Sequence, residues 1–452
     1  MCSRQSAQSR SIKGCAAGAG FILVLVAAAA LQGAQTPVPP SGVTFDVGHY
    51  RVQLALDVAA GTIAGTEHIE LTAREATTSF VFDSGALVVD SVASGGPLPF
   101  TQRERRLIVT LPAEARAGER RQLDITYHGA PRSGLTLLAK SAQAYTTFAT
   151  SQWMPAVNAP EDRATLDLEV SMPKGWRAAG SGREVEHRSR DGKTVYRWRQ
   201  ERDTASFLYG FVAGKFAEAT SRRGNVSLRY LGSTFSSGEL HRIFRDTPDM
   251  LTFFEKGAGL PYPGESYTQA LVATSGGQEL SGLAHMSEEY GRSVFDDFRA
   301  TGLMAHELAH QWWGDLVTNR DWTHFWLNEG FATFMASAYK EHARGRDAYL
   351  ADVDGWRRRV EQLRAAGHDR PLVFPDWNRP TADDRAVVYQ KGALALHQLR
   401  ELTGDATFWP AIRDYTRGHA GQSVTSADLQ RAFEASSGRD LHAFFDEWVS
   451  PR

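Results

Sequence analysis

The apolar positions from about residue 45 to about residue 215 come in short runs that predict β-strands. These runs are "HYRVQLALDV", "HIELTA", "SFVFDS", "RLIVTLP", "RQLDITYHG", "TLDLEVSMP" and "SFLYGFVAG". They alternate apolar and polar residues or pass through β-branched ones, and Gly, Pro, Asp or Ser separate them. Turn signals at about ten-residue spacing are typical of packed antiparallel sheets. We therefore expect an all-β, sandwich-like domain over residues 45–215.

From about residue 240 the apolar positions recur with the period of a helix. The segments are "ELHRIFRDTPDMLTFFEKGAG", "ATGLMAHELAHQWWGDLV", "GFATFMASAYKEHARG", "ALALHQLRELTG", "TSADLQRAFEASSG" and "LHAFFDEWV". Several begin at Ser or Thr and stop at Gly, as capped helices do. A mostly helical domain over residues 216–452 is expected, and the fold class is α+β with two domains.

A different pattern precedes the first strand. Residues 1–13 carry three basic residues and no acid, and "FILVLVAAAAL" and then "QGAQTPVPP" follow. This order is typical of a secretory signal peptide over residues 1–34, followed by a proline-rich linker over residues 35–44. An uncleaved membrane anchor is the alternative, because residues 16–45 carry no charge and about 20 apolar residues can span a bilayer. We expect an exported protein, periplasmic or extracellular, whose only membrane association would be through this segment.

Composition supports a globular exported chain. Of the 452 residues 42% are hydrophobic and 23% are charged, and a net charge of -2 gives no reason to expect a nucleic-acid partner. Cys2 and Cys15 both lie within residues 1–34, so the mature chain would have no disulfide. Removal of residues 1–34 takes away three basic residues of 50 and none of the 52 acids, which leaves a net charge of 47 minus 52, or -5.

The stretch "HELAHQWWGD" has the spacing of a zinc site. His306 and His310 lie four residues apart, so on a helix their imidazoles face one point. Glu307 lies about 100° around the helix and can reach a metal-bound water without being a ligand. A catalytic zinc commonly takes two His, one carboxylate and an open position. Glu329 in "WLNEGFATF", 19 residues after His310, can supply that carboxylate from a second helix. The alternative for "HELAH" alone is the polar face of an ordinary helix, but the second helix favours one Zn²⁺ per chain.

These motifs resemble the zinc aminopeptidases related to aminopeptidase N and leukotriene hydrolase, which share the HExxH-x18-E pattern. "YRVQLALDVAAGTIAGT" resembles the opening strands of that family's β domain, "VVYQKGALALHQL" its tyrosine-bearing helix, and "SGRDLHAFFDEWV" the end of its catalytic domain. The resemblance implies a thermolysin-like catalytic domain with His306, His310 and Glu329 as zinc ligands. It also implies that Glu307 is the general base and that Tyr389 steadies the tetrahedral oxyanion.

The segment "SGGQELSGL" departs from the family at two positions. The family has a Gly-Ala/Gly-Met-Glu-Asn motif beside the zinc, and its glutamate binds the α-amine of the substrate. Here Gly276, Gly277 and Glu279 are retained, whereas Gln278 stands where Met is usual and Leu280 where Asn is usual. The resemblance implies that this segment binds the substrate and that Glu279 anchors its amine.

Alternatives and a further departure remain at this stage. Glu279 could be a loop carboxylate, with Glu288 or Glu289 as the amine anchor. Ala336 stands where the family usually has a carboxylate that supports a zinc histidine, and Asp315 is a candidate to replace it. The resemblance stops where the family's catalytic domain stops, so we expect no large C-terminal helical domain and a more open cleft, or one completed by a partner subunit.

The function expected from these residues is that of a zinc-dependent aminopeptidase acting on peptides. A zinc endopeptidase is one alternative, although it would have no use for a buried amine anchor. A catalytically weakened, peptide-binding member of the family is the other, and the missing carboxylate at Ala336 keeps it open.

Overall fold

A computed structural model describes residues 42–374 and 380–450 of the chain. The expected signal peptide, both cysteines and most of the expected linker therefore lie outside the described residues. Within the described part of the chain, no helix combines the length and apolarity needed to cross a bilayer.

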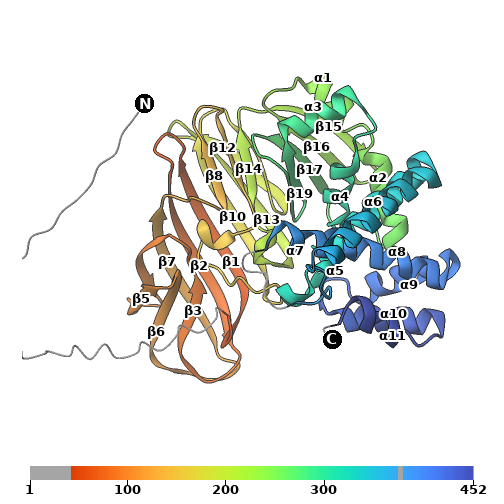
Figure 1. The fold of residues 1–452 in the computed structure, drawn as a ribbon. Helices are drawn as coiled ribbons and strands as arrows, with labels where there is room; N and C mark the ends of the chain where they lie inside the picture. The colour runs from red at the N-terminus through yellow and green to blue at the C-terminus, as the bar shows by residue number, and fades with distance from the viewer. Residues whose placement is uncertain (1–41, 375–379, 451–452) are drawn as a thin grey trace, which may run out of the picture. The chain divides into compact units, whose positions relative to one another are not determined.

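Four of the seven alternating segments lie in a seven-stranded sheet (Figure 1). Its central strands β1 (Phe45–Asp57) and β2 (Thr62–Ala73) run antiparallel, and alternate side chains along them are largely buried. The strand order is β12-β13-β10-β1-β2-β7-β4, with β1 and β10 parallel. The other strands are β4 (Val88–Ala93), β7 (Arg120–Gly129), β10 (Arg163–Pro173), β12 (Arg183–Arg190) and β13 (Lys193–Ala205).

A second, three-stranded sheet in the order β3-β6-β5 packs on this sheet across an apolar core. The ring of Phe45 lies 5.1 Å from that of Phe80 and 4.9 Å from that of Phe82, measured between centroids. The expected sandwich-like domain is therefore confirmed, and a four-stranded sheet in the order β11-β14-β9-β8 adjoins it. The bounds are β3 (Thr77–Asp83), β5 (Phe100–Arg103), β6 (Arg106–Ala115), β8 (Leu135–Leu138), β9 (Gln143–Thr146), β11 (Arg177–Gly180) and β14 (Phe211–Gly214).

The next strands form a separate mixed sheet in the order β15-β16-β17-β19-β18. The expected domain boundary between residues 215 and 216 lies between the last strand of the first part, β14, and β15. Strand β18 forms the edge of this sheet and contacts α4, so the sheet brings the "GGQEL" segment beside the "HELAH" segment. The bounds are β15 (Ala217–Arg223), β16 (Val226–Gly232), β17 (Ser266–Val272), β18 (Gly277–Leu280), β19 (Leu283–Ser287), α1 (Ser237–Ile243), α2 (Thr247–Ala258), α3 (Glu288–Asp296) and α4 (Gly302–Ala309).

The rest of the chain is mostly helical, as expected, with one helix shorter than the sequence predicted. The helical pattern continued to Val317, but α4 ends at Ala309, and His310 caps it. The chain then turns, and Gly314 adopts a φ of +133°, which favours glycine. The helices are α5 (Trp326–Arg344), α6 (Arg346–Ala365), α7 (Ala382–Ala386), α8 (Gly392–Thr403), α9 (Asp405–Gly418), α10 (Ser426–Ser437) and α11 (His442–Trp448).

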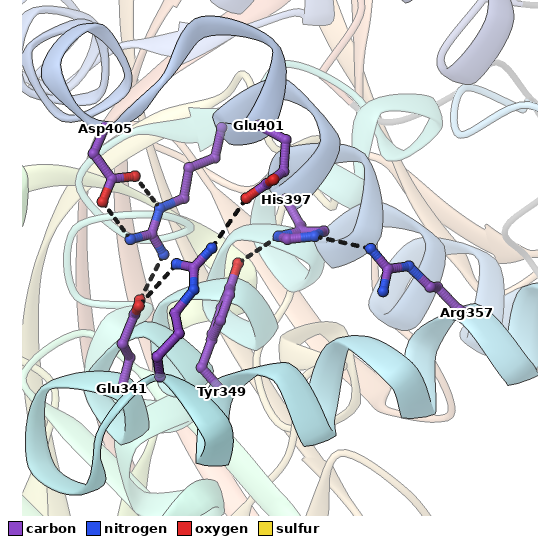
Figure 2. Close-up of polar contacts among 8 residues, drawn as sticks. Glu341, Tyr349, Arg357, His397, Glu401 and Asp405 are labelled. Atoms are coloured by element: carbon purple, nitrogen blue, oxygen red, sulfur yellow. Dashed lines mark hydrogen bonds and ion pairs between the residues drawn. The ribbon is translucent and has the colours of Figure 1, made fainter.

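Ion pairs around a buried arginine tie four of these helices together (Figure 2). Arg400 of α8 is only 4% exposed, and its guanidinium donates to both oxygens of Asp405 in α9 and to Glu341 in α5. Arg346 of α6 donates to the same Glu341 and to Glu401. This network fixes the C-terminal half of α5, about 18 Å along the helix from Glu329.

Candidate active site

Three side chains from two helices converge as a metal site. His306 and His310 come from the end of α4, and Glu329 from the first turn of α5. The Nε2 atoms of the two histidines lie 3.0 Å apart, and Oε2 of Glu329 lies 3.1 Å from Nε2 of His306 and 3.6 Å from that of His310. A tetrahedral zinc with ligands at about 2.0–2.2 Å separates them by about 3.3 Å. The donor set and its spacing therefore fit a zinc ion.

The acidic side chains around this triad also favour the binding of cations. Glu279, Glu307 and Glu329 are all nearly fully buried. Burial by itself lowers the pKa of His310, but the charges of these carboxylates raise it to about 10. Burial raises the pKa of Glu279 to about 8 and that of Glu307 well above its usual value. If all three carboxylates are ionised, a divalent metal and one further positive charge, such as an ammonium group, would balance them.

Glu307 faces the "GGQEL" segment across a glycine. A Cβ atom at Gly277 would lie 2.7 Å from the Cδ atom of Glu307 and would overlap its Oε1 atom. The other oxygen, Oε2, is buried and has no hydrogen-bond partner among the described residues. The carboxylate is therefore held beside the triad with one oxygen that no described protein group occupies. Gly276 is exposed, and open space surrounds the position where its Cβ would lie.

Tyr389 lies in a π turn of its helix and over the ring of His306. The five residues of η4 (Val387–Lys391) form this turn between α7 and α8. The ring of Tyr389 stacks on that of His306, with centroids 5.9 Å apart and planes 6° from parallel. Burial, and then the charge of Glu329, raise the pKa of Tyr389 well above its usual value. The hydroxyl stays protonated at neutral pH and can donate a hydrogen bond.

Two glycines let the helices that carry Glu329 and Tyr389 approach closely. A Cβ atom at Gly330 would lie 3.0 Å from Cα of Gly392 and 3.1 Å from the carbonyl oxygen of Val388. These are backbone atoms, which cannot swing aside as a side chain does. The spacing of residues does not predict this contact, although Gly330 in "NEGF" follows Glu329 and Gly392 in "YQKGAL" lies near Tyr389.

Glu279 sits on β18 with one carboxylate oxygen bonded and one free. Its Oε2 atom accepts a hydrogen bond of 2.8 Å from Nε2 of Gln278, whereas Oε1 is buried without a hydrogen-bond partner in the described parts of the chain. One oxygen of Glu279, one of Glu307 and one nitrogen of His310 lie within 4.8 Å of one another. Among the alternatives, Glu288 already accepts from Gln143 and Ser233, and Glu289 is exposed. The geometry therefore favours Glu279 over both as a ligand-binding carboxylate.

The suggested replacement for the carboxylate missing at Ala336 was wrong. Asp315 is buried, but its Oδ2 atom accepts from Nε2 of Gln311 at 2.7 Å, and its Oδ1 atom has no hydrogen-bond partner within residues 42–374 and 380–450. Nδ1 of His310 instead faces the backbone carbonyl of Trp313 at 3.3 Å. The chain turns back after α4, and this turn places a carbonyl where a side-chain acid was expected.

Comparisons with known proteins match both parts of the chain to one family. The model described as Peptidase M1 N-terminal domain matches residues 47–208, and that described as Peptidase family M1 domain matches residues 244–448. Aminopeptidase N from Streptomyces lividans is 26% identical over 309 residues, which cover 64% of this chain and 35% of that protein. Leucyl aminopeptidase from Saccharolobus solfataricus is 24% identical over 427 residues, covering 89% and 53% respectively. The chain thus spans about a third to a half of the length of these curated relatives.

Solved structures match over nearly their whole length. An M1 zinc metallopeptidase from Deinococcus radiodurans is 27% identical, with a TM-score of 0.77, and the match covers 91% of this chain and 95% of that one. A mutant of a two-domain M1 zinc metallopeptidase bound to L-tryptophan matches with the same identity and TM-score and covers 96% of that chain. The fold and the order of the two domains are therefore shared with these enzymes.

Proposed function

Because the chain belongs to peptidase family M1, we propose that it is a zinc aminopeptidase that removes the first residue of a peptide. The observation that carries this proposal is the buried Glu279 carboxylate, which keeps one oxygen without a hydrogen-bond partner among the described residues and has an oxygen within 4.8 Å of a His310 nitrogen. A zinc ion balances two of the three buried carboxylates. The ammonium of a substrate balances the third, and a blocked or internal peptide bond cannot.

The roles of the residues follow from their positions. His306, His310 and Glu329 hold zinc, which when bound polarises the scissile carbonyl and lowers the pKa of water. Glu307 takes a proton from the attacking water and delivers it to the leaving amine.

Two residues act on the substrate itself. The Tyr389 hydroxyl donates to the oxygen that gains negative charge, an interaction that typically contributes a few kcal/mol. Oε1 of Glu279 accepts a charge-assisted hydrogen bond from the substrate ammonium. That bond fixes the N-terminus, so that only the first peptide bond reaches the reacting groups.

A panel of free and N-acetylated aminoacyl amides tests this function, with and without a chelator. Free-amine substrates should be cleaved at least about 100-fold faster than acetylated ones, because acetylation leaves the carboxylate desolvated and unpaired. Glu279→Gln should lose most of this preference. Glu67→Gln is the matched control, since Glu67 is also buried and neither of its oxygens has a hydrogen-bond partner in the described structure. Cleavage of acetylated substrates and internal peptide bonds as fast as of free-amine substrates would support the endopeptidase alternative. Zinc binding without turnover of any substrate would support the peptide-binding alternative.

We also propose that the chain is exported, on the strength of the basic, apolar and small-residue order of residues 1–34. The N-terminus of the mature protein, read by mass spectrometry, tests this. Cleavage near residues 30–34 supports a signal peptide, whereas an intact N-terminus in the membrane fraction supports an anchor.

A further inference from the structure

The side chain of Gln278 is buried against the residue that the proposed function makes the amine anchor. Gln278 is 1% exposed and Glu279 is 3% exposed. Nε2 of Gln278 donates to Oε2 of Glu279 at 2.8 Å and to the backbone oxygen of Glu279 at 2.9 Å. The same carboxamide nitrogen therefore holds both the main chain and the side chain of its neighbour.

The backbone at this point is held from both sides. Strand β18 pairs with β19, where Gln278 lies opposite His285. From the turn after α4, Nε2 of Gln311 donates to the carbonyl oxygen of Leu280 at 3.0 Å, and Oε1 of Gln311 accepts from the amide of Gly282 at 2.9 Å. With the strand fixed, the position of the Glu279 carboxylate depends on its side-chain torsions.

Gln278 controls which oxygen of that carboxylate is free. Oε2 of Glu279 is occupied by the Gln278 bond, whereas Oε1 has no hydrogen-bond partner in residues 42–374 and 380–450. A carboxamide can donate here, but the methionine usual at this position in the resembling family cannot. An ammonium arriving at the site therefore meets a carboxylate that is already oriented.

We propose that Gln278 is a positioning residue for amine recognition: it clamps Oε2 of Glu279 so that Oε1 is presented to the N-terminal ammonium of the substrate. This inference rests on the proposed aminopeptidase function. On this proposal Gln278 acts through Glu279 and not directly on the metal or the substrate. Its effect should appear only with ligands that carry a free amine.

A pair of zinc-binding ligands isolates that effect. L-leucine hydroxamate carries the amine, and its des-amino counterpart, 4-methylpentanoyl hydroxamate, is otherwise alike. The ratio of their inhibition constants on the zinc-loaded protein measures recognition of the amine. For the wild type the des-amino ligand should bind at least about 10-fold more weakly, as expected when a hydrogen bond to a charged group is lost.

The variants Gln278→Met and Gln278→Leu both keep the approximate size of the side chain and remove its donor. In each, the ratio should fall about 10-fold or to near unity, while the inhibition constant of the des-amino ligand changes less than about twofold. In a Glu279→Ala background, Gln278→Met should change the ratio no further, because the clamp then has nothing to hold. Zinc content and the thermal midpoint show whether each variant is folded.

Gln269→Met is the matched control. Gln269 is a buried glutamine of β17 in the same sheet, and its Oε1 atom accepts from Thr247. Its loss should leave the ratio unchanged.

An unchanged ratio in both Gln278 variants would overturn the inference. So would equal weakening of both ligands, which would mean that Gln278 acts through the fold or the metal. A wild type that does not distinguish the two ligands would instead refute the proposed aminopeptidase function.

Discussion

The close approach of α5 to the π turn can be tested by adding one methyl group. In Gly330→Ala, the new Cβ would lie 3.0 Å from Cα of Gly392, whereas ordinary contacts of a Cβ begin near 3.4 Å. The two helices must therefore separate by about 0.4 Å, since the opposing atoms belong to the backbone. Glu329 precedes Gly330 directly, and Tyr389 lies on the opposing turn. The separation of the helices would therefore move Tyr389 away from Glu329.

The expected loss follows from this displacement. Overpacking of a core contact typically costs about 1–3 kcal/mol of the free energy of unfolding. A misplacement of 1 Å at a catalytic group can cost about 100-fold, so a shift of about 0.4 Å should lower kcat about 10-fold. Denaturant unfolding measures the free energy of unfolding and steady-state kinetics measure kcat, both on one preparation. The zinc content of the same preparation should remain near one per chain.

Gly355→Ala provides the control. Gly355 is also a helical glycine, in α6, but its Cβ would meet only the end of the Arg358 side chain, at 3.9 Å. The free energy of unfolding of this variant should rise by about 0.5–1 kcal/mol, because alanine favours a helix over glycine by about that amount, and its kcat should not change. If Gly330→Ala kept both full kcat and full stability, the close approach would not be what positions Tyr389.

Three further changes test individual groups. Tyr389→Phe keeps the ring that stacks on His306 and removes only the hydroxyl. The kcat should therefore fall about 100-fold, while inhibitor affinity should stay within about twofold of the wild type. Weaker inhibitor binding at normal kcat would mean that Tyr389 only lines the substrate site. Glu307→Gln should retain zinc and the thermal midpoint but lose about 100-fold or more in kcat, and near-normal turnover would reassign the base. Asp162→Asn should stabilise the protein increasingly as the pH rises from about 4 to about 7. Burial raises the Asp162 pKa from 3.8 to about 7, so the unfolded chain ionises first and wild-type stability is lost across this window. Thermal unfolding at pH 4 and pH 8 measures the difference, which should be near zero at pH 4; an equal difference at both would contradict the assignment.

The parts of the site that the sequence predicted best depend on local geometry. Two histidines four residues apart on a helix must face the same way, so the spacing in "HELAH" alone predicts that both imidazoles can bind one metal. The helix opened by Glu329 was also visible as a periodic segment. What required the family resemblance was the pairing of these segments with Tyr389 and Glu279, because the distance between separate elements is not encoded in either segment.

The errors have the same origin. Asp315 was a reasonable partner for a zinc histidine by sequence proximity, but the chain turns after α4, and Gln311 takes its Oδ2 atom. The apolar pattern that suggested a helix to Val317 comes instead from buried residues of this turn, among them Trp312 and Trp313. The bond from Gln278 to Glu279 depends on side-chain torsions, which the spacing of residues does not specify.

The π turn at Val387–Lys391 makes the position of Tyr389 sensitive to the number of residues in this helix. A π turn closes its hydrogen bond over five residues where an α turn uses four, so it holds one residue in excess. Deleting one residue there would let α7 and α8 continue as one regular α-helix, so the backbone that carries Tyr389 in the bulge would shift. The phenol would leave the face of His306, while all three residues of the triad stayed in place. In such a deletion variant, zinc binding should persist while the proposed turnover is lost, and reinserting the residue should restore turnover.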